Sequence, residues 1–246
     1  MPARPEALSH PKKAQPSIFD RLKQNRPKSV LLVPPTSAHM MSMSKWLHPN
    51  LGVERLASWV RKHGHYAETF DLNMYSILGT GQGRDTLTFA QKLKEKPWDV
   101  IGFSVYEATM VNDFTNMFAA EKLAPQALII AGGAAAQFAY QTVLDKSPAR
   151  VVVLGEGEKP LVSILEGKSL ESIPGVAFRT QSEVLSGEEF AETTEGLQYE
   201  DLPYELYWDY YLKLYRESGA DITPLLSKQV HTVRVYTRNY CPMNCT

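Results

Sequence analysis

The sequence is poor in cysteine and has no long apolar run, and these two absences exclude several classes of protein. It holds two cysteines among 246 residues, which is too few for a disulfide framework. No stretch approaches the ~20 apolar residues of a membrane-spanning helix, and the N-terminus lacks the apolar core of a signal peptide. We therefore expect a cytoplasmic protein in which the two thiols serve as metal or redox ligands.

An excess of charge of one sign is also missing from the chain as a whole. The formal net charge of -1 gives no overall attraction to nucleic acid. The charge is nevertheless uneven, because residues 1–28 hold seven Lys or Arg and residues 181–210 hold nine Asp or Glu with no Lys or Arg. We interpret residues 1–27 as a flexible basic leader, with nucleic-acid binding as the weaker alternative, and the acidic stretch as an exposed linker.

Short apolar runs alternate with helical patterns through the middle of the chain. Apolar runs predict strands over residues 29–33, 67–71, 100–105, 127–131 and 151–154, and apolar periodicity predicts helices over 52–63, 86–94 and 111–123 and from 161 onward. Strands that alternate with helices pair in parallel, and continuously apolar strands have helices on both faces. We therefore predict an α/β fold over residues 28–168, a doubly wound, mainly parallel, Rossmann- or flavodoxin-like sheet that binds ligands beyond the carboxyl ends of its strands.

Small and hydroxyl-bearing residues stand where two of these strands end. Gly102 allows a close backbone approach, while Ser104 and Thr109 offer hydroxyls to a ligand, although Thr109 could instead cap the next helix. Gly132 and Gly133 are followed by three alanines. A flat ligand or its tail could lie against that backbone, and tight packing of a helix on the sheet is the alternative.

Two further loops follow predicted strands. The loop 34–50 is long for a strand-to-helix connection and holds His39 and His48, so it is a candidate ligand-binding loop or a cap on the core. The turn Gly155-Glu156-Gly157-Glu158 has backbone amides that could cradle an anion, whereas its two glutamates would repel one. This mixed character argues against a simple phosphate loop.

The two cysteines, Cys241 and Cys245, lie next to Thr246 at the end of the sequence. A C-x3-C spacing alone is weak evidence for a metal site. They could be unrelated thiols, or half of a zinc site with His231, for which no fourth ligand is evident.

Taken in order, these motifs resemble the cobalamin-binding domain that precedes the catalytic barrel in B12-dependent radical S-adenosylmethionine (radical SAM) enzymes. That family's pattern of P-x-x-L-G, D-x-x-G-x-S, G-G and G-E-G-E is matched at residues 49–52, 99–104, 132–133 and 155–158. The resemblance continues through an apolar segment at 173–179, Leu202-Pro203 and an aromatic stretch, and so covers residues 29–246. It implies cofactor contacts from Leu51, Gly52, Gly102, Ser104, Val105, Tyr106, Thr109, Gly132, Gly133, Gly155, Glu156, Gly157 and Glu158.

The resemblance also assigns the cysteines and the rest of the chain. Cys241 and Cys245 match the first two thiolates of the family's C-x3-C-x2-C loop for a [4Fe-4S] cluster, and the third would fall at position 248, beyond Thr246. It implies a linker over residues 169–229 and the start of a truncated radical SAM domain over 230–246. On this reading the chain alone is not catalytically complete, and the missing barrel holds S-adenosylmethionine and a small-molecule or peptide substrate.

The activity that the resemblance implies is foremost that of a methyltransferase. Such an enzyme acts through methylcobalamin and a 5′-deoxyadenosyl radical. A radical SAM cyclase or rearrangement enzyme, and a stand-alone flavodoxin-like module for a corrinoid or nucleotide, remain as alternatives. The D-x-H-x-x-G pattern of other cobalamin domains is absent, so we expect no histidine on the lower face of cobalt, with His39 and His48 as the only local candidates.

Overall fold

A seven-stranded sheet forms the centre of the protein. The computed structural model describes residues 17–36, 49–73, 88–180, 183–187, 202–205, 207 and 219. The strands are β1 (Ser29–Val33), β2 (Tyr66–Thr69), β3 (Val100–Ser104), β4 (Leu128–Gly132), β5 (Val151–Val153), β6 (Val176–Arg179) and β7 (Val184–Ser186). They lie in the order β2-β1-β3-β4-β5-β6-β7, with β1 to β5 parallel and β6 and β7 antiparallel to their neighbours. The predicted doubly wound, mainly parallel fold is confirmed.

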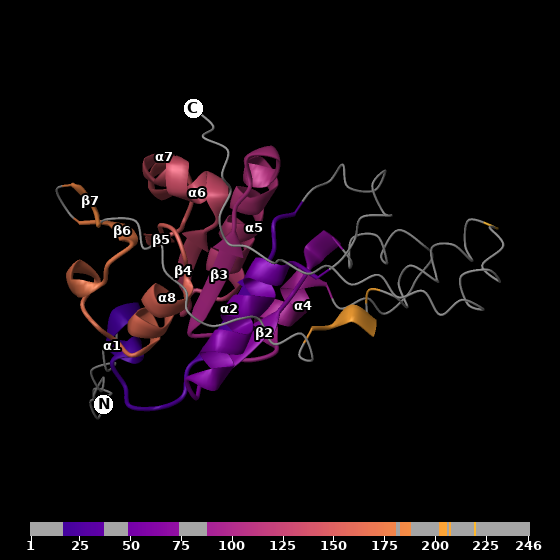
Figure 1. Cartoon of the computed structure of the whole chain (residues 1–246), viewed down its shortest axis with the longest axis horizontal. Coiled ribbons are helices and arrows are strands. Elements are labelled where there is room, and N and C mark those ends of the chain that lie inside the picture. The colour runs from indigo at the N-terminus through magenta and orange to yellow at the C-terminus, as the bar shows by residue number, and fades with distance from the viewer. Residues whose placement is uncertain are drawn as a thin grey trace, which may run out of the picture.

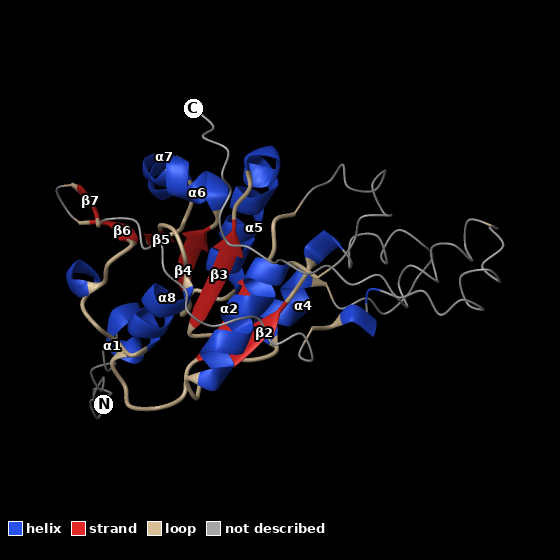
Figure 2. Cartoon of the chain, viewed as in Figure 1, coloured by secondary structure: helices blue, strands red, loops and turns tan. Residues whose placement is uncertain are grey.

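Helices cover both faces of this sheet (Figures 1 and 2). They are α1 (Ile18–Leu22), α2 (Leu51–Lys62), α4 (Phe89–Lys94), α5 (Met110–Leu123), α6 (Ala134–Phe138), α7 (Tyr140–Lys146) and α8 (Glu158–Leu165), with 3-10 turns at η2 (Glu107–Thr109) and η3 (Leu170–Ser172). None of these described helices is long and apolar enough to cross a membrane.

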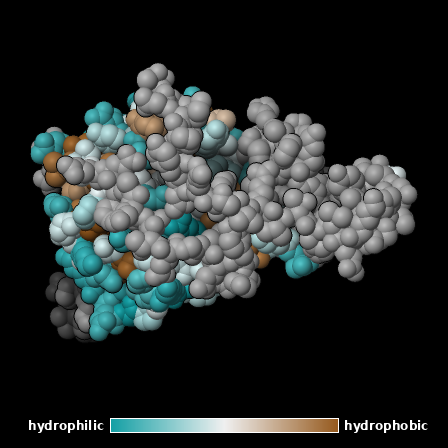
Figure 3. Space-filling model, in the orientation of Figure 1, coloured by the Kyte–Doolittle hydropathy of each residue, from teal (hydrophilic) through white to brown (hydrophobic). Residues whose placement is uncertain are grey.

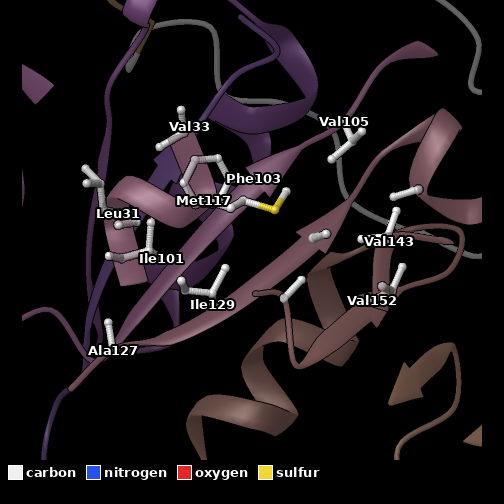
Figure 4. Packing of buried hydrophobic residues seen from close by; sticks show 14 of the residues in the cluster. Leu31, Val33, Ile101, Phe103, Val105, Met117, Ala127, Ile129, Val143 and Val152 are labelled. Carbon is white, nitrogen blue, oxygen red and sulfur yellow. The ribbon is translucent and has the colours of Figure 1, made fainter. Parts of the chain in front are cut away.

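Successive strand residues point to opposite faces, so each face has its own apolar core. On one face, Leu31, Ile101 and Ile129 pack against Met117 of α5 (Figure 4). On the other face, neighbouring strand residues pack under α2, α8 and α1; these include Val30, Leu32, Val100, Leu128 and Ile130, with Val53, Ala57, Leu161, Ile164 and Leu22 from the helices. Burial of continuously apolar strands on both sides is what the sequence pattern predicted.

All the predicted strands and helices of the sheet domain are present, with ends shifted by a few residues. The largest shifts, of three residues, are at α4, which begins at Phe89 rather than 86, and at α8, which begins at Glu158 rather than 161. Two helices, α6 and α7, follow Gly133 and were not predicted. The sheet also continues past residue 168, because β6 and β7 lie inside the range expected as a linker: β6 pairs with β5, and β7 pairs with β6. Each is only three or four residues long, too short for a clear periodic signal.

The stretch of residues 17–28, expected to belong mostly to a flexible leader, is folded against the amino edge of the sheet. Helix α1 begins at a capping box between Ser17 and Asp20. Farther on, Arg26 binds Asp99 with two hydrogen bonds, at 2.6 and 2.8 Å. Asp99 also accepts the Ser29 amide at 2.9 Å, which joins the beginnings of β1 and β3. The surface around this lower part of the molecule is largely hydrophilic (Figure 3).

Several predicted features lie outside the described residues. They are residues 1–16 of the leader, the cysteines Cys241 and Cys245, the histidines His39 and His48, and the range 230–246.

Candidate functional site

The carboxyl ends of β1 and β3 form the topological switch point of the sheet. The chain runs from β1 outward to β2 and then returns to pair β3 on the other side of β1. Loops diverge at such a point and leave a crevice beyond the strand ends, where ligands of open α/β sheets bind. The candidate site is therefore the crevice edge made by Pro34–Thr36, by the residues after Ser104 and by Gly132–Gly133.

The end of β4 approaches the end of β3 so closely that a side chain would not fit. Gly133 has φ 90 and ψ 172, a conformation that is essentially restricted to glycine. A Cβ atom there would lie 2.9 Å from the Ser104 hydroxyl and 3.0 Å from the Val105 carbonyl oxygen. The Val105 amide donates to the Gly132 carbonyl at 2.8 Å, so backbone contacts lock the two strand ends together.

This junction presents polar and bare backbone groups to the crevice. The half-buried Ser104 hydroxyl has no hydrogen-bond partner among the described residues, while Gly133 and Ala134 are exposed. A Cβ on Gly132 would meet nothing nearer than 3.8 Å. Tyr106, which follows β3 in the sequence, has an exposed aromatic side chain. The sequence analysis placed Ser104 and Gly132–Gly133 at the ends of two predicted strands, and the structure brings these residues together.

Two of the predicted contact residues lie beneath the crevice surface. Gly102 is buried, and a Cβ there would lie 2.8 Å from Cδ2 of Leu32, so its small size makes room for packing between β1 and β3. The Thr109 hydroxyl lies 2.6 Å from Oδ2 of Asp113 and is likewise buried. It makes no side-chain cap to α5. Both residues support the crevice from below.

The turn after β5 is folded inward rather than shaped as an anion cradle. Glu158 is 3% exposed and its Oε1 lies 2.8 Å from Nε of Arg55, while its Oε2 has no partner among the described atoms. Burial raises the pKa of Glu158 above its usual value, and Arg55 opposes that rise. A Cβ on Gly157 would lie 3.0 Å from Leu56. The Gly155 amide donates to Gln137 at 3.3 Å, which leaves half-buried Glu156 at the rim.

Helix α2 begins at another predicted contact. Asn50 caps it by accepting the Val53 amide at 3.1 Å. Leu51 is buried, whereas Gly52 is exposed, and a Cβ there would meet only the Asn50 side chain at 3.6 Å. Packing within the described chain therefore does not require a glycine at position 52.

Sequence reasoning missed the residues that hold the end of β1. Thr36 donates its amide to Oδ1 of Asp113 at 2.9 Å, and the Pro35 carbonyl accepts Nδ2 of Asn73 at 2.8 Å. Burial raises the pKa of Asp113 to about 6, against hydrogen bonds from Thr109, Thr36 and Tyr106 that lower it. A signal was available, because Asp113 shares the buried stripe of α5 with Met117 and Ala120 at i, i+4 and i+7.

A second missed contact reaches the crevice from far along the chain. The Tyr207 hydroxyl donates to Asp71 at 2.6 Å, and Asp71 accepts the Asn73 backbone and side-chain amides at 2.9 and 3.0 Å. Tyr207 and Leu202 are buried. Tyr207 belongs to the aromatic stretch noted in the sequence, but its spacing gave no indication of a contact 136 residues away.

The described residues at this edge of the sheet include no evident metal centre. No group of three or more His, Cys, Asp or Glu side chains suited to a metal is found among them. What this edge offers is a hydroxyl, bare backbone and an aromatic ring, which suit a bulky organic ligand.

Comparison with known proteins gives a consistent result. The family model described as the B12 binding domain matches residues 40–165. Over 105 residues the chain is 28% identical to the anaerobic magnesium-protoporphyrin IX monomethyl ester cyclase of Cereibacter sphaeroides. That match covers 39% of this chain and 17% of the cyclase.

Two solved structures share the fold. One is the radical S-adenosylmethionine methyltransferase TsrM from Kitasatospora setae, with cobalamin and a [4Fe-4S] cluster bound (TM-score 0.54, 19% identity, covering 70% of this chain and 31% of that one). The other is the cobalamin-dependent S-adenosylmethionine radical enzyme OxsB, with aqua-cobalamin and S-adenosylmethionine bound (TM-score 0.53, 20% identity, 72% and 23%). The chain thus spans less than a third of the length of each relative.

Proposed function

The chain belongs to the B12 binding domain family, and from that membership we propose that it is the cobalamin-binding part of a cobalamin-dependent radical SAM enzyme. The observation that carries the proposal is the family match over residues 40–165, which includes the ends of β3 and β4 at the crevice. The fold shared with TsrM and OxsB supports it, since both of those enzymes bind cobalamin.

The crevice residues fit such a ligand. We propose that the nucleotide tail of cobalamin runs along the bare backbone of Gly132 and Gly133, which a side chain would obstruct. The Ser104 hydroxyl is placed to bond a polar group of that tail, and Gly52, Tyr106 and Glu156 would border the ligand. Leu51, Gly102, Val105, Thr109, Gly155, Gly157 and Glu158 would hold these residues in place rather than touch it.

Bound cobalamin would supply a carrier for a methyl group or an electron, and the protein's contribution is to hold and shield it. The closed β3–β4 junction fixes one side of the crevice without rearrangement on binding. Buried apolar strands beneath the crevice keep water from the sheet side. We propose that Cys241 and Cys245 supply two of three thiolates for a [4Fe-4S] cluster whose remaining iron binds S-adenosylmethionine. Thiolate and cluster chemistry of this kind suits the reducing cytoplasm.

The direct test is titration of the 246-residue chain with hydroxocobalamin, followed by absorbance and by gel filtration. We expect a stoichiometric complex that survives gel filtration. A chain that elutes without corrinoid would contradict the proposal. Ser104→Ala should weaken binding by about threefold to tenfold, as expected for one lost hydrogen bond. Thr115→Ala is the matched control, because its hydroxyl bonds within α5 on the exposed surface.

Methyl transfer is the reaction we favour, because TsrM is a methyltransferase. Ring formation is the second candidate, favoured by the 28% identity to a cyclase. The holoenzyme distinguishes them through its products from S-adenosylmethionine. Recharging a corrinoid with a methyl group releases S-adenosylhomocysteine, whereas a cyclase has no need to form it.

A further inference from the structure

One peptide unit at the end of β1 is held at both of its poles. Its carbonyl, on Pro35, accepts Nδ2 of Asn73 at 2.8 Å, and its amide, on Thr36, donates to Asp113 at 2.9 Å. The two groups belong to one rigid plane and point in opposite directions. The peptide therefore cannot rotate or slide without breaking one of the two hydrogen bonds.

These bonds are the middle of a longer chain of contacts across the carboxyl edge. On the β2 side, Asp71 accepts hydrogen bonds from both Asn73 and the Tyr207 hydroxyl. On the β3 side, Asp113 accepts the Thr109 hydroxyl at 2.6 Å. Tyr207 lies 136 residues beyond Asp71 in the sequence, so the chain of contacts joins a distant residue to the crevice.

We infer that Asn73 and Asp113 are positioning residues for cobalamin, which clamp the Pro35–Thr36 peptide and so fix the β1 side of the crevice, and that Tyr207 couples the C-terminal part of the chain to this clamp. The inference rests on the proposed function.

The location of Asp113 favours a role in binding over a role in the fold alone. Asp113 is 1% exposed, and no ion pair to it is found among the described residues. At the opposite edge, Asp99 also bridges β1 and β3, but there Arg26 neutralises it. A buried carboxylate without a cation costs stability, and such costs are concentrated at functional sites.

The experiment measures hydroxocobalamin affinity at a temperature where circular dichroism shows every variant to be folded. Asp113→Ala should weaken binding by about tenfold, because it leaves the Thr36 amide without an acceptor. Asp113→Asn should recover part of this loss, because one amide oxygen can still accept that N–H. Asn73→Ala should weaken binding by about threefold to tenfold by releasing the other pole of the peptide.

The matched control is Asp99→Asn, which breaks the bridge at the far ends of the same strands. It should lower the melting temperature but leave the affinity within about twofold of the wild type, because it lies away from the crevice. Tyr207→Phe, which removes only the outermost hydroxyl, should weaken binding by about threefold.

The possible outcomes separate the two proposals. If the wild type binds and the Asp113 and Asn73 variants bind equally well despite lower melting temperatures, the clamp is structural only and the inference is overturned. Equal losses of affinity in Asp99→Asn and Asp113→Asn would overturn it as well. A wild-type chain that binds no corrinoid would overturn the proposed function, and the inference with it.

Discussion

The amino and carboxyl edges of the sheet each join β1 to β3 through a carboxylate, but the two carboxylates have different partners. At each edge a buried aspartate bridges β1 and β3. At the amino edge, burial acts to raise the pKa of Asp99, but hydrogen bonds from Arg26 and Ser29 outweigh it and the pKa falls below its usual value. At the carboxyl edge, burial raises the pKa of Asp113 to about 6. The first edge neutralises its carboxylate with an arginine, whereas the second, where the ligand is proposed to bind, holds a buried carboxylate with hydrogen bonds but with no ion pair among the described residues.

The largest effect on stability is expected from Asp99→Asn. This change leaves Arg26 and the Ser29 amide without a charged acceptor, and the free energy of unfolding should fall by about 2–3 kcal/mol at pH 7. Because the folded pKa is lowered, the contribution of Asp99 is present above its unfolded pKa and is lost as pH falls through the folded value. Urea denaturation at pH 7 checks the loss, and equal stability of the two proteins would contradict the proposed difference between the edges.

Gly133→Ala should be the next most damaging change, at the carboxyl edge. The residue would have to occupy φ 90 with its Cβ 3.0 Å from the Val105 carbonyl, and the expected cost is about 2 kcal/mol. A side chain at this position would therefore destabilise the domain as well as obstruct the proposed ligand. Gly132→Ala, whose Cβ would meet Val153 at an ordinary van der Waals distance of 3.8 Å, is the control and should cost under about 1 kcal/mol. Thermal unfolding of both variants decides the point.

Asp113→Asn should cost much less than Asp99→Asn, under about 1 kcal/mol at pH 7, because it removes a charge that is costly to bury. The folded protein binds the Asp113 proton more tightly than the unfolded chain, whose pKa is about 3.9. The free energy of unfolding therefore falls as pH rises from about 4 to above 6. The difference between wild type and variant, measured by urea denaturation at pH 4, 5, 6 and 7, should change in favour of the variant as pH rises. A difference independent of pH would contradict this account.

The smallest effect is expected from Glu158→Gln, also at the carboxyl edge. Burial raises the pKa of Glu158, and one of its oxygens has no partner among the described atoms. The neutral amide keeps an oxygen for Arg55, so the change should lie within about 1 kcal/mol of zero at pH 7. Denaturation at pH 5 and pH 8 checks the sign, since a carboxylate with a raised pKa loses stability as pH rises. If Glu158→Gln lowered the free energy of unfolding as much as Asp99→Asn does, the proposed difference between the amino and carboxyl edges would be contradicted.

The sequence predicted the sheet far better than it predicted the contacts between distant segments. Continuous apolar runs and helix periodicity are local signals, so β1 to β5 and α2, α4, α5 and α8 could be located. Ser104 and Gly132–Gly133 were found because small and hydroxyl residues at strand ends have a local meaning.

Other residues carry no such local signal. Asn73 and Tyr207 contribute through partners far away in the chain, and their residue types are ordinary for a loop and an aromatic stretch. The inward turn of Glu158 depends on Arg55 of a different helix, which spacing along the chain does not reveal. Asp113 lies between these two groups of residues. The sequence shows its place on the apolar stripe of a helix, but it does not show that the carboxylate accepts hydrogen bonds from Thr36 and Thr109.

The short strands at the two ends of the sheet have a consequence for how the protein behaves at high concentration. A long unpaired strand at the edge of a sheet is a template for pairing with another chain. Here β2 has four residues and β7 has three, and Glu68 in β2 forms ion pairs with Lys92 and Lys96. Few backbone groups are therefore available to pair with another chain. At the β2 edge, charged side chains also lie beside these groups. The short edge strands and the charges beside β2 therefore oppose edge-to-edge aggregation of this sheet.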